Sequence, residues 1–222
     1  MTSPPRSPGR SPGEAGRVAR LGLAKLYVVT PDLPPDRVVD LATAAVRGGA
    51  DIIQLRHKTL PRGELLTLAR RLRELIRAAL FVVNDHVDIA VLSGADGVHL
   101  GPDDLSIGAA RRVGGDRLLI GASASTAETA RAAVAEGADY IGCGATFTTP
   151  VKGEKKVIGP QGVALVVRAL GPVPVFAIGG IDESNVEQLT AMGLHRACVI
   201  RAVAEARDPE QATRRLRAML TT

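Results

Sequence analysis

Between Lys25 and the C-terminus, short apolar runs alternate eight times with longer segments of helical periodicity. The short runs are rich in β-branched residues, which is typical of buried strands. We predict strands at 26–30, 52–56, 81–85, 97–100, 118–123, 140–145, 175–178 and 197–201. We predict helices at roughly 36–48, 62–79, 86–93, 106–113, 126–136, 160–170, 183–193 and 208–220.

Alternating strands and helices indicate a parallel sheet, and eight such units indicate a closed barrel. The predicted fold class is therefore α/β, a single (β/α)8 TIM barrel over residues 21–222. About 200 residues is the low end for this fold, so its loops must be short. The competing architecture is an open doubly wound sheet. It usually has fewer strands, and the Gly-rich dinucleotide fingerprint expected after its first strand is missing here.

The composition excludes several classes of protein. The chain has three Phe, two Tyr and no Trp, which disfavours nucleic-acid binding through aromatic stacking. Its apolar runs are far too short to span a membrane. Two cysteines, Cys143 and Cys198, make neither a disulfide framework nor a zinc-ligand spacing. We therefore expect a cytoplasmic protein whose partners are small molecules rather than nucleic acid or membrane.

The first twenty residues differ from the rest. They hold four arginines, one glutamate and four prolines, and they lack the apolar run of a secretory signal. We predict that residues 1–20 form a disordered basic tail without an assigned function.

Polar side chains gather where the predicted strands end. Because catalytic residues of a barrel lie where its strands end and its loops begin, this face is the expected site. Two of its loops also hold four of the five lysines of the chain. The residues concerned are Gln54, Arg56 and Lys58; Asn84 and Asp85; Asp103 and Asp104; Ser123; Thr148, Thr149 and Lys152; and Gly179 and Gly180.

Gln54 and Arg56 share a face of their strand, because strand side chains alternate. Both should point into the upper barrel, where an unpaired guanidinium is costly. Arg56 is therefore either paired with a neighbouring acidic residue or available for a phosphate-bearing ligand.

Asp85 and Asp104 follow adjacent strands. Two neighbouring carboxylates beside basic residues suit Mg²⁺, which takes one or two carboxylates plus phosphate oxygens. The alternative for Asp104 is a cap on the helix after it. Asn84 is either a turn residue or a partner for the edge of a heterocycle.

Two further segments suit anions. Thr148, Thr149 and Lys152 offer hydroxyls and an ammonium for a carboxylate or phosphate, although a solvated loop is the alternative. Gly180 and the segment 200–201 follow the last two strands, where barrels commonly bind phosphate through backbone N–H groups. His99 is expected to be a hydrogen-bonded core histidine. With no strong general base among the candidates, the residues favour chemistry in which a diphosphate leaves.

Seven segments together resemble the thiamine phosphate synthase family, in order and at family-like spacing from about residue 25 to 220. They are IIQLRHK, FVVNDHVDIA, GADGVHLGPDDL, GAS, ADYIGCGATFTTPVK, VFAIGGI and VIRAV. The resemblance implies an Mg²⁺-dependent transferase that joins hydroxymethylpyrimidine diphosphate to a thiazole phosphate. The products are thiamine phosphate and diphosphate.

The resemblance also implies roles for individual residues. Asp85 and Asp104 are the implied Mg²⁺ ligands, and Arg56, Lys58, Ser123 and Lys152 the implied catalytic group. The pyrimidine diphosphate site of the family resembles Gln54, Arg56, Lys58 and Asn84. The residues that hold its leaving diphosphate resemble Ser123 and Lys152. Thr149, Gly180, Ile200 and Arg201 resemble the thiazole phosphate site, and Val151 falls within the same implied substrate-binding set.

Three positions depart from the family pattern. Val151 replaces a usual threonine, His57 an acidic or small residue, and Arg201 a frequent serine. Two other functions remain open: a thiazole tautomerase of the same superfamily, and a non-catalytic barrel that binds phosphate ligands. Ser125 stands where the tautomerase has its proton-shuttling histidine, and intact metal and lysine positions argue against a degenerate barrel. A homo-oligomer is also open.

Overall fold

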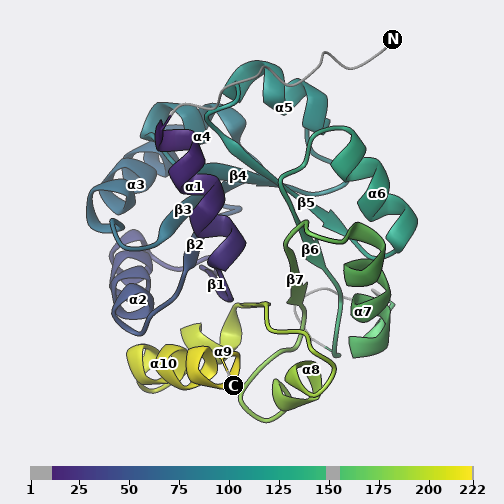
Figure 1. Cartoon of the computed structure of the whole chain (residues 1–222). Coiled ribbons are helices and arrows are strands. Elements are labelled where there is room, and N and C mark those ends of the chain that lie inside the picture. The colour runs from purple at the N-terminus through teal and green to yellow at the C-terminus, as the bar shows by residue number, and fades with distance from the viewer. Residues whose placement is uncertain (1–11, 149–155, 222) are drawn as a thin grey trace.

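The fold is a closed barrel of eight parallel strands surrounded by helices (Figure 1). The computed structural model describes residues 12–148 and 156–221. The strands follow one another around the barrel in chain order, and β1 closes it by pairing with β8. The strands are β1 Leu26–Val29, β2 Ile52–Leu55, β3 Leu80–Asn84, β4 Gly97–Leu100, β5 Leu119–Ala124, β6 Tyr140–Cys143, β7 Val175–Ile178 and β8 Ala197–Val199. The predicted (β/α)8 barrel is confirmed, and each predicted strand is found.

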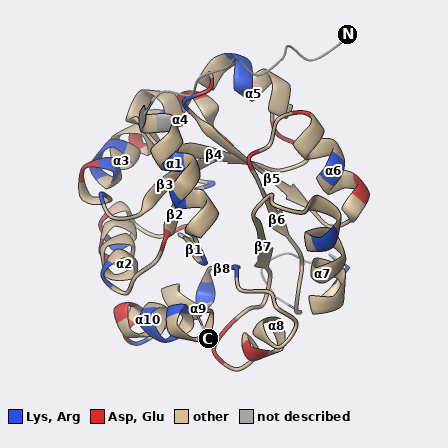
Figure 2. Cartoon of the chain, in the orientation of Figure 1, with Lys and Arg blue, Asp and Glu red and all other residues tan. Residues whose placement is uncertain are grey.

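Helices cover the outside of the barrel and carry many of the charged residues (Figure 2). Side chains cap several of them: Ser106 accepts from the backbone of Ala109 at the start of α5, and Thr126 forms a capping box with Thr129. The helices are α1 Pro12–Leu23, α2 Pro35–Arg47, α3 Arg62–Leu75, α4 Val87–Ser93, α5 Ile107–Gly114, α6 Ala127–Ala135, α7 Gly159–Leu170, α8 Glu187–Thr190, α9 Arg201–Ala204 and α10 Pro209–Met219.

Two helices were not predicted, and one is shorter than predicted. α1 and α9 are additional, while the helix expected at 183–193 is reduced to the four residues of α8. There, the Asp182 carboxylate accepts from the backbone of Ser184, and the Asn185 carbonyl accepts from the backbone of Asp182. These side-chain bonds favour a turn over a helix.

Alternation along the strands divides the core into two layers. One set of side chains faces the helices, and the other fills the barrel. The interior is close-packed: a β-carbon at Gly121 would lie 2.1 Å from the ring of Tyr140, so the absent side chain makes room for the large one. The interior set is Tyr27, Val29, Ile52, Leu80, Val82, Leu119, Tyr140, Phe176 and Cys198.

Three carboxylates link neighbouring strands at the end of the barrel where the strands begin, which is called the closed end below because α1 covers it. Each belongs to a Gly-Ala-Asp sequence that ends a helix and leads into an even-numbered strand. Each accepts a hydrogen bond from a backbone N–H of the preceding strand and pairs with an arginine of a covering helix. These carboxylate links are Asp51 with Leu26 N–H and Arg217; Asp96 with Phe81 N–H and Arg73; and Asp139 with Ile120 N–H and Arg111.

α1 corrects the prediction of a disordered tail over residues 1–20. Residues 12–20 are helical, and residues 1–11 lie outside the described residues. Val18 and Leu21 pack against the interior side chains, and Arg20 donates to the carbonyl of Ala78 just before β3 at 2.8 Å. α1 therefore lies across the end of the barrel where the strands begin (Figure 1). The Arg- and Pro-rich composition obscured the two apolar positions, which stand three residues apart as on one helix face.

Among the described residues, no helix is long and apolar enough to cross a membrane.

Leu21→Ala should destabilise the protein if α1 closes the barrel. Leu21 is only 2% exposed, and loss of a buried leucine costs about 2–4 kcal/mol of the free energy of unfolding. Leu23→Ala is the matched control, because Leu23 belongs to the same helix but is 77% exposed. It should change stability by less than about 0.5 kcal/mol. Urea denaturation measures both, and equal effects would show that α1 is not docked.

Candidate active site

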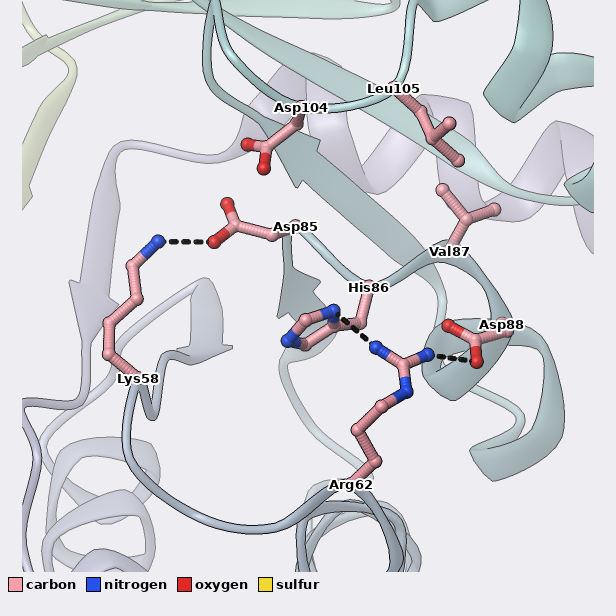
Figure 3. Close-up of a pocket in the computed structure, with 8 residues that line it drawn as sticks. All are labelled: Lys58, Arg62, Asp85, His86, Val87, Asp88, Asp104 and Leu105. Carbon is pink, nitrogen blue, oxygen red and sulfur yellow. Dashed lines mark hydrogen bonds and ion pairs between the residues drawn. The ribbon is translucent and has the colours of Figure 1, made fainter.

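A pocket of about 390 Å³ opens where β2, β3 and β4 end. Its walls come from the loops and helix starts that follow these strands (Figure 3). The lining residues are Lys58, Arg62, Asp85, His86, Val87, Asp88, Asp104 and Leu105. Three of them, Lys58, Asp85 and Asp104, are predicted site residues that the fold has brought together.

Asp85 forms an ion pair with Lys58 across the pocket. The Lys58 ammonium donates to the Asp85 carboxylate at 2.5 Å. Burial alone would raise the pKa of Asp85, but hydrogen bonds with Lys58 and Asp104 outweigh it and hold that pKa below its usual value. Asp85 is therefore an anion next to a cation.

The backbone of Asp85 is unusual. Its φ of 63° makes it the only non-glycine in the left-handed region among residues 12–148 and 156–221. Its N–H donates to the carbonyl of His99 at 2.9 Å, which ties the end of β3 to β4. Backbone conformations of this kind cost free energy and gather at functional sites.

Asp104 faces Asp85 from the loop after β4 (Figure 3). One of its oxygens accepts from the N–H of Gly101 at 2.7 Å. Burial and the nearby Asp85 carboxylate raise the pKa of Asp104, because both disfavour a second negative charge. The alternative role as a helix cap is wrong, since Ser106 caps α5.

Arg56 and Lys58 are held by Asp32, a residue that the sequence analysis missed. Asp32 lies in the loop after β1 and accepts from the backbone N–H of Lys58 at 2.6 Å. Its other oxygen lies 3.5 Å from the guanidinium of Arg56. The sequence analysis left open whether Arg56 pairs with a neighbouring acidic residue, and Asp32 is that residue. Its one signal in the sequence was its place just after a predicted strand.

His57 links the loop after β1 to the loop after β2. It is buried, and its Nε2 lies 2.9 Å from the carbonyl of Leu33 in the β1–α2 loop. Its Nδ1 accepts from the N–H of Leu60 at 3.2 Å. This departure from the family pattern therefore packs behind the pocket.

Gln54 and Asn84 end their strands beside the pocket. The Gln54 amide nitrogen donates to the hydroxyl of Tyr27 at 2.6 Å inside the barrel. Asn84 is partly exposed and stands in register with His99 of β4. His99 is hydrogen-bonded as expected, because its Nε2 lies 3.0 Å from the Ser123 hydroxyl, but it is partly exposed and not a core residue.

The remaining candidates follow β7 and β8. Gly180 has φ 66°, and a β-carbon there would lie 2.6 Å from the carbonyl of Thr148, so this close approach requires glycine. Ile200 follows β8 at the start of α9 and precedes Arg201, which is partly exposed and 3.9 Å from Glu205. Thr149, Val151 and Lys152 lie outside the described residues.

A second charged group lines the outer part of the pocket and was also missed. Arg62 of α3 lies 2.9 Å from Nδ1 of His86 and pairs with Asp88 of α4 (Figure 3). The Arg62 side chain lowers the pKa of Asp88 chiefly through this hydrogen bond. No local pattern links these residues, because they meet only when α3 and α4 pack together.

The donor set fits Mg²⁺. Among the residues that the structure describes, no three His, Cys, Asp or Glu side chains converge as a metal cage. Mg²⁺ does not need one, since it takes one or two carboxylates and fills its other positions with water and phosphate oxygens. Asp85 and Asp104 supply two facing carboxyl groups, and the pocket beside them has room for the rest.

The chain matches proteins of one family over most of its length. Residues 26–203 match the family described as thiamine monophosphate synthase. The chain is 47% identical over 208 residues to the thiamine-phosphate synthase of Anaeromyxobacter dehalogenans, covering 92% of this chain and 90% of that protein. It is 44% identical over 202 residues to that of Thermosynechococcus vestitus, covering 90% of this chain. Here the chain spans only 57% of the relative's length.

Solved structures agree with this relationship. Thiamine phosphate pyrophosphorylase from Pyrococcus furiosus superposes with a TM-score of 0.82 at 39% identity, covering 91% of this chain and 98% of that one. A 3-hexulose-6-phosphate synthase superposes with a TM-score of 0.71 at 21% identity, covering 88% and 99%. The second likeness shows the shared barrel fold alone.

Asp32→Ala should weaken anion binding in the pocket. The substitution frees the guanidinium of Arg56 and removes the bond that holds the backbone of Lys58. We therefore expect binding of Mg²⁺ with inorganic diphosphate to fall about tenfold. The control is Asp36→Ala, because Asp36 is highly exposed at the start of α2 and its ion pair with Arg71 adds little. Isothermal calorimetry measures both. Wild-type affinity in Asp32→Ala would contradict this role.

Proposed function

This chain belongs to the thiamine monophosphate synthase family, and we propose that it is itself a thiamine phosphate synthase. It would join 4-amino-2-methyl-5-(diphosphooxymethyl)pyrimidine to a thiazole phosphate, releasing diphosphate. The observation that carries the proposal is the cluster of Lys58, Asp85 and Asp104 in a pocket at the strand ends. Two carboxylates and an ammonium are the groups that a metal-bound diphosphate leaving group requires.

The relatives that support this activity are those matched along nearly all of their own length. They are the synthase of Anaeromyxobacter dehalogenans and the pyrophosphorylase of Pyrococcus furiosus. Both names refer to thiamine phosphate, and the second also refers to pyrophosphate.

The pyrimidine diphosphate would bind over β2 and β3. Gln54 and Asn84 stand at the ends of these strands, where they can bind the ring. Arg56 and Lys58 follow β2, and Asp32 holds the backbone of Lys58 and the guanidinium of Arg56. Both cations would bind the diphosphate. The thiazole phosphate would bind across the barrel mouth, near Gly180, Ile200 and Arg201.

The reaction would proceed by departure of the diphosphate before the new bond forms. Mg²⁺ held by Asp85 and Asp104 would neutralise charge on the leaving group. Arg56, Lys58, Ser123 and Lys152 would stabilise the same developing charge through hydrogen bonds. The thiazole nitrogen then attacks the pyrimidine cation, and this step needs no general base. That agrees with a pocket in which each described carboxylate already has a basic or backbone partner.

We place this reaction in the cytoplasm. Cys143 and Cys198 are both buried, and two cysteines do not make the disulfide framework that is common in secreted proteins. The substrates are small phosphorylated molecules, and no nucleic acid takes part.

Incubation of the purified protein with both substrates and Mg²⁺ tests the proposed function. We expect thiamine phosphate and diphosphate to appear in equal amounts. Rearrangement of a thiazole without joining would instead identify a tautomerase. Binding of both substrates without any product would identify a non-catalytic barrel.

Asp85→Asn and Asp104→Asn should each lower turnover at least about 10²-fold, because each removes a ligand of the metal that neutralises the diphosphate. A chelator in excess should do the same to the wild type. Asp103→Asn is the matched control: Asp103 is exposed next to Asp104, and turnover should stay within about twofold of the wild type. Full activity in excess chelator would exclude the metal site.

Lys152→Ala should slow turnover more than it weakens substrate binding. An ammonium that neutralises a departing diphosphate acts mainly in the transition state, and loss of such a contact costs about 10²–10³ in kcat. Lys156→Ala is the control, because Lys156 is exposed and should tolerate the change. Steady-state kinetics separate kcat from KM. Normal turnover in Lys152→Ala with a defect in Lys156→Ala would show that the wrong lysine has been assigned.

A further inference from the structure

We propose that Tyr27 is a positioning residue that orients the Gln54 amide, so that its carbonyl oxygen faces the barrel mouth and selects a ring bearing an amino group. The inference rests on the proposed function, because it concerns the pyrimidine of that reaction. Tyr27 itself lies below the ring site and acts through Gln54.

The first observation is where the Gln54 amide lies. Gln54 is only 4% exposed and pairs in register with Val29 of β1. Tyr27 stands two residues before Val29, one interior layer nearer the closed end of the barrel. The Gln54 amide nitrogen donates to the Tyr27 hydroxyl at 2.6 Å, so it points towards that closed end. Since the amide is planar, its carbonyl oxygen is turned the other way.

The second observation is that Tyr27 cannot move away. Its hydroxyl lies 2.9 Å from that of Tyr140, and both side chains are buried. Its ring meets Phe176 edge-on at a centroid distance of 5.4 Å and Tyr140 at 5.9 Å. Close packing on these sides gives the hydroxyl one position. The hydroxyl has a single proton, and when that proton is donated to Tyr140 only a lone pair is left for Gln54, so the amide must present its nitrogen.

The third step is chemical. A carbonyl oxygen facing the mouth accepts a hydrogen bond from an amino group on a heterocycle. An oxo group at the same ring position would put two acceptors together and leave the buried amide unsatisfied. Sites built to bind one polar group reject an analogue that lacks it. The orientation set by Tyr27 therefore becomes a preference for the aminopyrimidine over its oxo analogue.

Tyr27→Phe tests the inference, because it removes the hydroxyl and keeps the ring. The probes are the aminopyrimidine diphosphate and its 4-oxo analogue, each titrated with Mg²⁺ by calorimetry. We expect the wild type to prefer the amino compound at least tenfold, and Tyr27→Phe to reduce this preference to less than threefold. In turnover, KM for the pyrimidine should rise more than kcat falls, and KM for the thiazole phosphate should stay unchanged.

Thr213→Val is the matched control. It removes an equally buried hydroxyl, but one that belongs to α10 outside the barrel and donates to the carbonyl of Pro209. Its preference for the amino compound should stay within twofold of the wild type. A thermal melt of each variant shows whether it folds.

A double variant separates positioning from general loosening of the barrel. In a Gln54→Leu background, Tyr27→Phe should not change the amino preference further, because the amide that it orients is gone. A wild-type preference retained in Tyr27→Phe would overturn the inference, as would an equal loss in Thr213→Val. Absence of product in the turnover assay, with the binding preference intact, would instead overturn the proposed function.

Discussion

Three carboxylates at the closed end of the barrel hold its strands in register. Asp51, Asp96 and Asp139 each join an even-numbered strand to the N–H of the strand before it and to an arginine of a covering helix. A shift of one residue in any strand would send every interior side chain of that strand to the outer face. This register sets the positions of Gln54, Asn84 and Ser123 at the barrel mouth, although the three carboxylate links lie at the opposite end.

The barrel mouth places two carboxyl groups close together, an arrangement that like-charge repulsion disfavours in a folded protein. Asp85 adopts a left-handed backbone, and Asp104 faces it with its pKa raised by burial and by that neighbour. Lys58 relieves part of the repulsion, and a divalent cation would relieve more. Such an arrangement adds little to stability, and under the proposed function it would bind a ligand that carries both a metal and a diphosphate.

Much of this architecture could be predicted from the sequence, because each strand is a β-branched run and each helix is periodic. The candidate site residues were proposed from their places at the predicted strand ends, and the fold brings Lys58, Asp85 and Asp104 together in one pocket. Asp32 and the group around Arg62 could not be found in this way, since their partners come from loops and helices distant in sequence. α1 was missed because two apolar residues, Val18 and Leu21, are hidden among prolines, glycines and arginines.

The central claim is that Asp85, Asp104 and Lys58 form one site for a divalent cation with a diphosphate. Mn²⁺ in place of Mg²⁺ makes that site visible by electron paramagnetic resonance. In the presence of inorganic diphosphate, we expect the wild type to bind one Mn²⁺ per chain and Asp85→Asn to bind it at least tenfold more weakly. Equal Mn²⁺ binding by the wild type and by this variant would contradict the claim.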